Sequence, residues 1–345
     1  MNMNKGVSIV ICCYNSSKLL PETIRHISLL KIPAGISCEI IVVDNNSNDN
    51  TSETAEELLK KYISGNVTYK ILFQPVQGLS AARKMGFENS AYEYIIFCDD
   101  DNWLNADYIE ILINTMRKSE KIGAVGGEST AVSDEVFPWW FQEFSQSYSA
   151  GKQSESDGII SGEKAALWGA GMAVRRSALK ELYSNGFRSI LSDRKKKELS
   201  SGGDIELCYA LRLAGWEIWY ESSLKIRHFI PGHRLKWDYL RKLSRGFGAQ
   251  KVNLDPYFIS NQNSSDRNSQ KWRYQAFRFM KKLRGYGFTK LVRFKNYPEG
   301  DPEILRIEKT IGRLTEILKI RGEYDKRIKS VREASWRNND QIKKS

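Results

Sequence analysis

Short apolar, β-rich runs alternate with amphipathic segments over the first 118 residues, and this alternation limits the fold more than any other feature of the chain. Residues 7–13 and 39–43 are apolar runs with the length of a buried strand. Between these runs, apolar side chains recur at helical spacing from Leu19 to Leu30. Further strands are predicted over 67–73, 94–98 and 216–220, and further helices over 55–62, 78–89, 106–118 and 204–214.

This alternation predicts an α/β fold with a mainly parallel central sheet flanked by helices. Ligands of such sheets bind at the carboxyl ends of the strands. Those ends fall at Cys13–Asn15, Asp44–Asp49 and Asp99–Asn102, which are all polar. Two loop-rich lobes, expected over 128–165 and 188–204, would lie above these strand ends.

Three consecutive carboxylates follow the strand predicted over 94–98. They belong to Asp99, Asp100 and Asp101. Neighbouring acids repel one another unless a cation or a proton resolves the repulsion. Hard divalent ions such as Mg²⁺ and Mn²⁺ prefer oxygen ligands and commonly bridge phosphates. The alternative is a solvated acidic turn, but the position directly after a buried strand favours a cation site.

The positive charge of the chain is concentrated in its last third. The net charge is +12, and from Lys236 onward there are 27 Lys and Arg but only 12 Asp and Glu. The first 235 residues hold 26 basic and 29 acidic residues. We therefore expect a catalytic domain over 1–235 and a basic, helical extension over 236–345 that meets an anionic partner.

Residues 271–295 of the extension carry nine Lys or Arg, no acid and several aromatic rings. This composition is typical of a segment that lies on an anionic membrane surface. A helix docked on the main domain and a nucleic-acid-binding segment are the alternatives. Residues 304–318 form a short heptad-like apolar stripe that pairs with another chain or docks on its own domain. Residues 334–345 are expected to form a frayed polar tail.

Cysteine usage and hydropathy bear on the compartment. None of the five cysteines forms a Cys-x-x-Cys pair, so we expect buried free thiols in a reducing compartment. No run of 18 apolar residues is present, and residues 1–15 lack the features of a signal peptide. We therefore expect no transmembrane helix and a cytoplasmic protein, peripheral on the inner face of the cell membrane.

The acidic segment after residue 98 resembles the Asp-x-Asp motif of glycosyltransferases with the GT-A fold, and companion motifs follow in the order of that family. Over residues 6–235 the chain resembles an inverting glycosyltransferase of family 2. The motifs that carry the resemblance are the first strand Ser8–Asn15, the second-strand segment Val42–Asp49, the helix start Gly78–Arg83, the Gly-containing loop Leu167–Arg176 and the helix start Gly203–Leu207.

The resemblance implies a nucleotide-sugar site at these motifs, in which Asp44 contacts the base or the ribose. Asn45 and Asn46 depart from the commonest Asp-Gly form, which leaves the base open, and we expect a UDP-sugar. The resemblance assigns nucleotide-sugar binding to Cys13, Tyr14, Asn15, Asp44, Asn46, Arg83, Asp99, Asp100, Trp168 and Gly169.

The resemblance also implies a divalent metal, Mn²⁺ or Mg²⁺, held by Asp101 with Asp99 and His228. In the alternative arrangement, Asp99 or Asp100 holds the ribose hydroxyls. A lone histidine near a strand end is also often structural, so both roles stay open for His228. The catalytic base implied by the resemblance is Asp204, at the start of a predicted helix where Gly203 replaces the usual Glu.

The function that follows is transfer of a sugar from a nucleoside diphosphate to a hydroxyl of a glycan, expected to be lipid-linked, in surface polysaccharide biosynthesis. A nucleotidyltransferase is one alternative, but it would usually show a Gly-rich basic loop near the N-terminus, and residues 10–20 contain no glycine. A non-enzymatic protein that binds nucleic acid through 236–345 is the other, although no nucleic-acid partner is expected.

Overall fold

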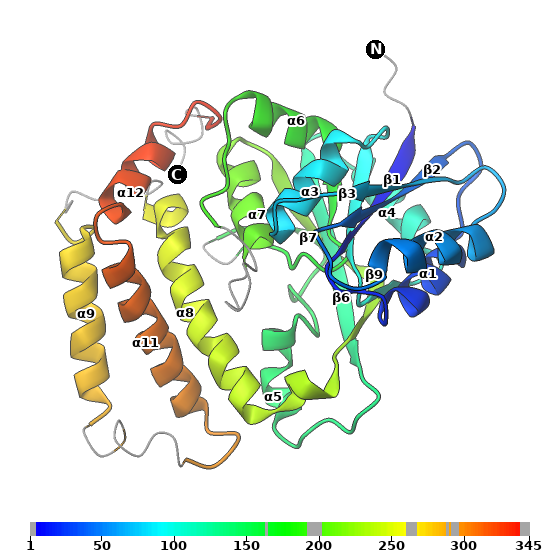
Figure 1. The fold of residues 1–345 in the computed structure, drawn as a ribbon. Helices are drawn as coiled ribbons and strands as arrows, with labels where there is room; N and C mark the ends of the chain where they lie inside the picture. The colour runs from blue at the N-terminus through cyan, green and yellow to red at the C-terminus, as the bar shows by residue number, and fades with distance from the viewer. Residues whose placement is uncertain are drawn as a thin grey trace.

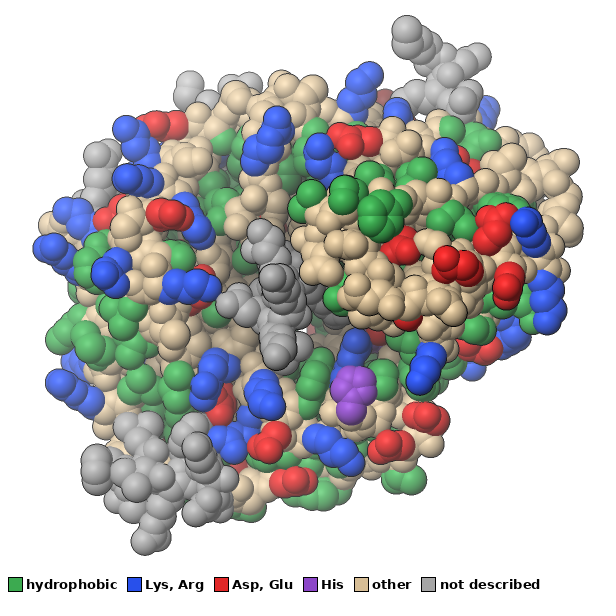
Figure 2. Space-filling model, in the orientation of Figure 1, with side chains coloured by type: hydrophobic (Ala, Val, Ile, Leu, Met, Phe, Trp, Pro, Cys, Tyr) green, Lys and Arg blue, Asp and Glu red, His purple; other side chains and the backbone are tan. Residues whose placement is uncertain are grey.

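The computed structural model describes residues 5–162, 165–191, 202–259, 268–287, 290 and 297–338. A central sheet carries helices on both faces, and a layer of C-terminal helices stands beside it (Figure 1). Lys and Arg side chains gather over the left and lower parts of the face in Figure 2, where Figure 1 draws α8, α9 and α11. The basic extension therefore forms a helical layer next to an α/β body.

The described strands join into one sheet in the order β3-β2-β1-β4-β8-β6-β9-β5, with β7 paired to β9. The strands predicted from the sequence all form. β9 extends well beyond the predicted range 216–220. The strands are β1 Gly6–Cys13, β2 Ser37–Asp44, β3 Thr68–Phe73, β4 Tyr94–Asp99, β5 Asn102–Leu104, β6 Ile122–Val132, β7 Gly158–Ile159, β8 Ala173–Arg175 and β9 Glu217–Phe229.

The first half of the sheet is parallel, as the sequence predicts. β1 pairs with β2 on one side and with β4 on the other, and β2 pairs with β3. The register sets Cys13 opposite Asp44 and Cys12 opposite Asp99. The carboxyl ends of the three strands therefore meet at one edge of the sheet, where their polar extensions come together.

The second half of the sheet is mixed, which differs from a mainly parallel sheet. β8 runs antiparallel to β4 and β6, and β5 runs antiparallel to β9, while β6 and β9 are parallel. The strand β6 escapes prediction because its glycines weaken the strand pattern. Gly127 is required there, since a Cβ would overlap the carbonyl of Leu224 on β9. The pairing of β5 with β9 sets His228 opposite Asn102.

Helices cover the two faces of the sheet in separate apolar clusters. α1, α2 and α4 pack on one face, and α3, α6 and α7 pack on the other. The helices are α1 Leu20–Ser28, α2 Thr51–Tyr62, α3 Leu79–Glu88, α4 Tyr108–Met116, α5 Phe141–Phe144, α6 Arg176–Ser184, α7 Gly203–Leu213, α8 Trp237–Ile259, α9 Trp272–Gly285, α11 Pro302–Lys319 and α12 Tyr324–Arg332, with 3₁₀ turns η1 Ser145–Tyr148 and η2 Gly232–Leu235.

The C-terminal helices have an apolar cluster of their own and also share the cores of the body. Leu254 and Tyr257 of α8 belong to the same cluster as α7. Trp237, at the start of α8, packs edge-on against Trp140, with the ring centroids 5.3 Å apart. α8 begins at Trp237, close to the predicted boundary between 235 and 236, and among the described residues no strand follows it. The division into domains stays a prediction.

Two sequence expectations for the extension can be compared with the structure. The apolar stripe over 304–318 docks on its own chain, because Ile304 and Ile307 of α11 are buried. The expected polar tail is wrong for residues 334–338, since Trp336 is buried and packs edge-on on Phe187. Residues 339–345 lie outside the described residues, as do 192–201 in the second lobe.

All five cysteines are buried and unpaired, as expected. Among the helices described, none combines the length and the apolar character needed to cross a membrane.

A close contact between α8 and α11 holds the helical layer together. A Cβ at Gly312 of α11 would overlap the carbonyl oxygen of Arg245 on α8. A Cβ at Gly248 of α8 would likewise overlap the carbonyl oxygen of Lys309 on α11. The two glycines therefore let the backbones approach face to face, and this approach fixes the position of α11.

We expect Gly312→Ala to lower the free energy of unfolding by about 1–3 kcal/mol, because the added methyl group pushes α11 away from α8. Chemical denaturation measures this change. Gly322→Ala is the matched control, since its Cβ would meet open space. Equal stabilities for the two variants would contradict the close helix contact.

Candidate active site

Two cavities meet at the carboxyl edge of the sheet. The first cavity, of about 240 Å³, lies at the ends of β1 and β4 and is bounded by the start of α3. The second cavity, of about 430 Å³, lies between the start of α7 and the helices α8 and α11. Arg234, on η2, lines both cavities, so its guanidinium stands where they adjoin.

The first cavity gathers five of the residues predicted to bind a nucleotide sugar. They are Cys13, Tyr14, Asn15, Asp99 and Asp100. The ends of β1 and β4 bring them together, because the two strands are parallel neighbours in the sheet. The carboxylates and backbone polar groups at these strand ends can bind the hydroxyls of a ribose.

Two other predicted binding residues, Asp44 and Asn46, line neither cavity. Asp44 is buried, and its two oxygens accept from Ser47 N at 2.9 Å and from Ser52 Oγ at 2.6 Å. These bonds shape the loop after β2 and fix the start of α2. The direct contact of Asp44 and Asn46 with a nucleotide stays a prediction.

Asn45, which the sequence reasoning left out of the binding residues, does line the first cavity. Its amide Nδ2 donates to Val76 O at 2.7 Å, and its Oδ1 accepts from Gly78 N at 2.7 Å. Asn45 therefore holds the loop that leads into α3. The sequence shows a polar run from the end of β2 onward but not which of its residues turns toward the cavity.

The three consecutive acids divide between two surroundings. Asp99 and Asp100 line the first cavity, where the hydroxyl of Ser16 donates to Asp100. Asp101 is buried and lies toward β9 instead. β4 ends at Asp99 and the chain turns at the next two residues, so one acidic run supplies two separate places.

Arg83 of α3 lies behind the first cavity rather than in its wall. It is buried, and its Nη2 stands 3.6 Å from Asp99 Oδ1. A Cβ at Gly169 would overlap the Arg83 guanidinium, so the loop can pass Arg83 closely only with glycine there. Arg83 thus supports the position of Asp99 and of the Gly169 loop.

The buried carboxylate of Asp101 links the end of β4 to β9 and η2. Asp101 Oδ2 lies 3.2 Å from Arg234 Nη1 and 3.5 Å from His228 Nε2. Its Oδ1 accepts from Asn102 Nδ2 at 3.0 Å. Burial opposes the charge of Arg234, but Asp101, then Tyr239 and Asp100 raise the pKa of its guanidinium above the usual value. The pairing therefore keeps Asp101 compensated in a buried place.

The orientation of His228 is set from the opposite side of its ring. Its Nδ1 lies 2.9 Å from the carbonyl oxygen of Tyr148, and since a carbonyl can only accept, Nδ1 carries a proton. Nε2 therefore faces Asp101. Asp101 and His228 are the pair best placed to hold a metal, although among the described residues no three His, Cys, Asp or Glu side chains form a metal-binding group.

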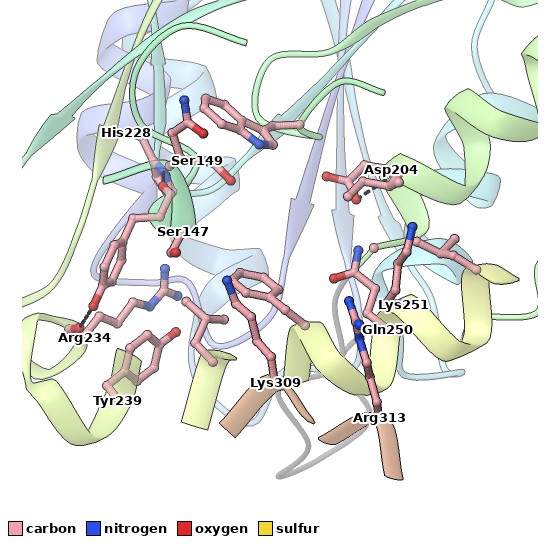
Figure 3. A pocket seen from close by; sticks show the side chains of 18 of the residues that line it. Ser147, Ser149, Asp204, His228, Arg234, Tyr239, Gln250, Lys251, Lys309 and Arg313 are labelled. Atoms are coloured by element: carbon pink, nitrogen blue, oxygen red, sulfur yellow. Dashed lines mark hydrogen bonds between the residues drawn. The ribbon is translucent and has the colours of Figure 1, made fainter. Parts of the chain in front are cut away.

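The second cavity has Asp204 at its upper edge (Figure 3). Asp204 stands in the first turn of α7, and its Oδ2 accepts from Gly169 N at 2.6 Å. The positive end of the helix dipole favours a carboxylate there. Gly202, just before the helix, has φ +116°, which glycine adopts without strain. Trp168 and His228, also predicted site residues, line the same cavity.

A buried glutamate anchors the helix that carries Asp204. Glu206 accepts from Ile190 N at 2.6 Å, from Leu191 N at 3.2 Å and from the Tyr257 hydroxyl at 2.6 Å. Burial raises the pKa of Glu206, and these hydrogen bonds oppose the rise. The start of α7 is thereby fixed both to the preceding segment and to α8.

The cationic wall of the second cavity is a further feature that the sequence does not predict. Lys251 of α8 and Lys309 and Arg313 of α11 line it, below Asp204 in Figure 3. The composition of 236–345 indicates the positive charge, but it favours a partner outside the protein. The packing of α11 on α8 turns part of that charge toward the site.

A family profile and named relatives agree with this architecture. Residues 8–183 match the profile of Glycosyl transferase family 2. The poly-beta-1,6-N-acetyl-D-glucosamine synthase of Staphylococcus epidermidis is 26% identical over 230 residues, which are 66% of this chain and 50% of that protein. The protein of the same name from Staphylococcus aureus strain COL is 28% identical over 123 residues, 36% of this chain and 28% of that protein. The chain thus spans half or less of the length of these relatives.

Solved structures share the fold at low sequence identity. S. aureus TarS 1–349 in complex with UDP has a TM-score of 0.51 and 14% identity, and the match covers 93% of this chain and 91% of that one. GalNAc-T7 with UDP, GalNAc and Mn²⁺ has a TM-score of 0.52 and 14% identity, covering 92% of this chain and 56% of that one. The likeness to both structures concerns the fold alone.

Proposed function

This chain belongs to glycosyl transferase family 2, and we propose that it transfers a sugar from a nucleoside diphosphate to an acceptor hydroxyl with inversion at the anomeric carbon. The observation that carries the proposal is the position of Asp204. Its carboxylate stands over the second cavity, which adjoins the first cavity at Arg234. A donor in the first cavity and an acceptor in the second would then meet beside one base.

The proposed donor is a UDP-sugar, with its nucleoside in the first cavity. Asp99 and Asp100 offer carboxylates to the ribose, and Asn45 shapes the wall beside them. Both structures of the same fold described above contain UDP, which supports a uridine nucleotide. The diphosphate would then lie toward Arg234, whose positive charge stabilises the leaving group.

In the proposed reaction, the oxygen of the acceptor hydroxyl attacks the anomeric carbon and its proton passes to Asp204. The bond between that carbon and the diphosphate oxygen breaks, and the nucleoside diphosphate leaves with the electron pair. The hydrogen bond from Gly169 N holds the Asp204 carboxylate in one orientation. Orientation of the two substrates in adjoining cavities supplies a further part of the rate.

A divalent metal, Mg²⁺ or Mn²⁺, fits the pair Asp101 and His228. The Nδ1 proton of His228 points to the Tyr148 carbonyl, which leaves the Nε2 lone pair directed at Asp101. Magnesium often takes only one or two protein ligands together with substrate phosphates. Such an ion would neutralise charge on the departing diphosphate. Asp99 remains the third predicted ligand.

We propose a glycan acceptor, lipid-linked and belonging to surface polysaccharide synthesis. The relatives named as poly-beta-1,6-N-acetyl-D-glucosamine synthases support an acceptor of this class. The second cavity has a volume of about 430 Å³ and is lined by Trp168, and both features suit a sugar ring.

We also propose that α9 rests on an anionic membrane, on the cytoplasmic face. Its inner side docks through Ala276 and Phe279, which are buried, while Tyr274, Phe277 and Met280 on the outer side are 46%, 57% and 42% exposed. The basic residues Arg273, Arg278, Lys281, Lys282 and Arg284 are also exposed. Rings among cations are typical of helices at the headgroup level. Phe288 and Phe294, of the same predicted segment, lie outside the described residues.

Asp204→Asn is expected to lower kcat by about 10²–10⁴-fold, because asparagine keeps the shape but cannot take the proton. Release of UDP from a panel of UDP-sugars measures turnover, and calorimetry with UDP should find nucleotide binding intact. Asp238→Asn, at an exposed side chain that lines neither cavity, is the control. Substantial turnover in the Asp204 variant would show that Asp204 is not the catalytic base.

Asp101→Asn is expected to weaken UDP binding and to abolish its response to metal, since the variant loses the anionic partner of His228. Calorimetry with Mn²⁺ and again with EDTA measures both effects. Asp134→Asn, at an exposed acid, should behave like the parent protein. If EDTA leaves the parent's affinity unchanged, Arg234 supplies the charge alone and the metal proposal fails.

Phe277→Ser combined with Met280→Ser is expected to reduce binding to vesicles that contain phosphatidylglycerol about tenfold or more, because two apolar side chains no longer enter the interface. Co-sedimentation measures the bound fraction. Val136→Ser removes another exposed apolar side chain, 94% exposed, and should not change binding. Retention on nucleic acid instead of vesicles, without turnover of any nucleotide sugar, would favour the non-enzymatic alternative.

A further inference from the structure

The second cavity is built by two parts of the chain with opposite chemistry. Asp204 and Trp168 stand on the side of the sheet domain. Lys251 of α8 and Lys309 and Arg313 of α11 form the opposite side (Figure 3). Among the described residues that line this cavity, Asp204 is the only acid. The cavity that holds the proposed base, Asp204, therefore also has a strongly cationic wall.

Lys309 and Arg313 lie one helical turn apart on the same face of α11. Like charges at this spacing repel each other. Burial lowers the pKa of the Lys309 ammonium, and the charges of Arg313 and then Arg306 lower it further. Two cations held together in this way bind an anion favourably, because the anion relieves their repulsion.

The acids of α11 do not neutralise this pair. Glu308 is bound by Arg241 and Arg245 of α8, at 3.1 and 2.6 Å. Glu316 Oε1 accepts from Asn253 Nδ2 at 3.0 Å. Glu303, the remaining acid of the helix, pairs with Lys290. Within the described part of the chain, neither Lys309 nor Arg313 has an ion-pair partner.

Arg313 also keeps hydrogen-bonding capacity. Its buried Nε has no hydrogen-bond partner among the described residues. Asp255 of α8 is half-buried, and the charge of Arg313 lowers the pKa of its carboxyl. Its Oδ2 accepts from the Tyr324 hydroxyl at 2.8 Å. The Arg313 guanidinium offers a planar set of donors, which matches the oxygens of a phosphate.

We propose that the acceptor is anionic: a phosphate or phosphodiester group of the acceptor binds Lys309 and Arg313, while a hydroxyl of the same molecule reaches Asp204. This inference rests on the proposed transferase function and names its acceptor class. The phosphate stays intact, since the transfer forms a bond only between the acceptor hydroxyl oxygen and the sugar. Both a polyol phosphate and a lipid diphosphate carry this chemistry.

The test compares three acceptors in the full chain, with UDP-sugar donors and UDP release as the readout. They are an oligo(glycerol phosphate), a prenyl-diphosphate-linked N-acetylglucosamine in detergent, and a neutral chito-oligosaccharide. We expect KM to be at least about tenfold lower for a phosphate-bearing acceptor than for the neutral one, as charge-assisted hydrogen bonds require. Whichever phosphate-bearing acceptor has the lower KM identifies the source.

Lys309→Gln combined with Arg313→Gln should raise KM for the phosphate-bearing acceptors about tenfold or more. The same double variant should change the KM of the neutral acceptor much less, so that the preference for phosphate-bearing acceptors is lost. Lys319→Gln, exposed and on the same helix, is the matched control. Equal effects of the double variant on charged and neutral acceptors would overturn the inference.

Direct binding separates this inference from the transferase function. If the parent protein turns over no acceptor, calorimetry with the oligo(glycerol phosphate) still decides the anion site. Binding that the double variant loses supports the site even though the transferase proposal fails. Absence of binding to the parent protein overturns the inference, whether or not the neutral acceptor is glycosylated.

Discussion

The buried carboxylate of Asp101 is the constraint on which the site depends. A charged group inside a protein must be paired, and Arg234 meets this need from η2, while His228 of β9 faces the same carboxylate. The backbone of Asp101 makes a second link to β9, since Phe229 N donates to Asp101 O at 2.9 Å. The end of β4 is thereby tied to the chain that leads into α8. Arg234, held by this pairing, stands between the two cavities.

The helical layer forms part of the site, because α8 and α11 line the second cavity. Gly248 and Gly312 let α8 and α11 pack with their backbones in contact, and this packing presents Lys309 and Arg313 to the cavity beside Asp204. The outer helix α9 keeps a separate basic and aromatic face. The basic C-terminal third thus supplies both the inner wall of the second cavity and the outer surface of α9. Composition alone cannot separate the two.

Much of the fold could be predicted because its signals are local. The strand and helix patterns up to Met116, and the polar ends of β1, β2 and β4, follow from neighbouring residues. The mixed half of the sheet could not be predicted. The glycines of β6 hide a strand pattern, and Leu224, the residue that requires glycine at Gly127, lies about a hundred positions away on β9.

By itself, the sequence determined that polar and acidic residues gather at one edge of an α/β sheet and that the basic charge belongs to the C-terminal third. Both facts depend on residues close together in the chain. Only the tertiary structure decided that Asn45 rather than Asp44 lines the first cavity, because a one-residue change of direction reverses which side chain points inward. It alone also paired Arg234 with Asp101, 133 positions apart, since such a contact arises only when η2 packs against the end of β4.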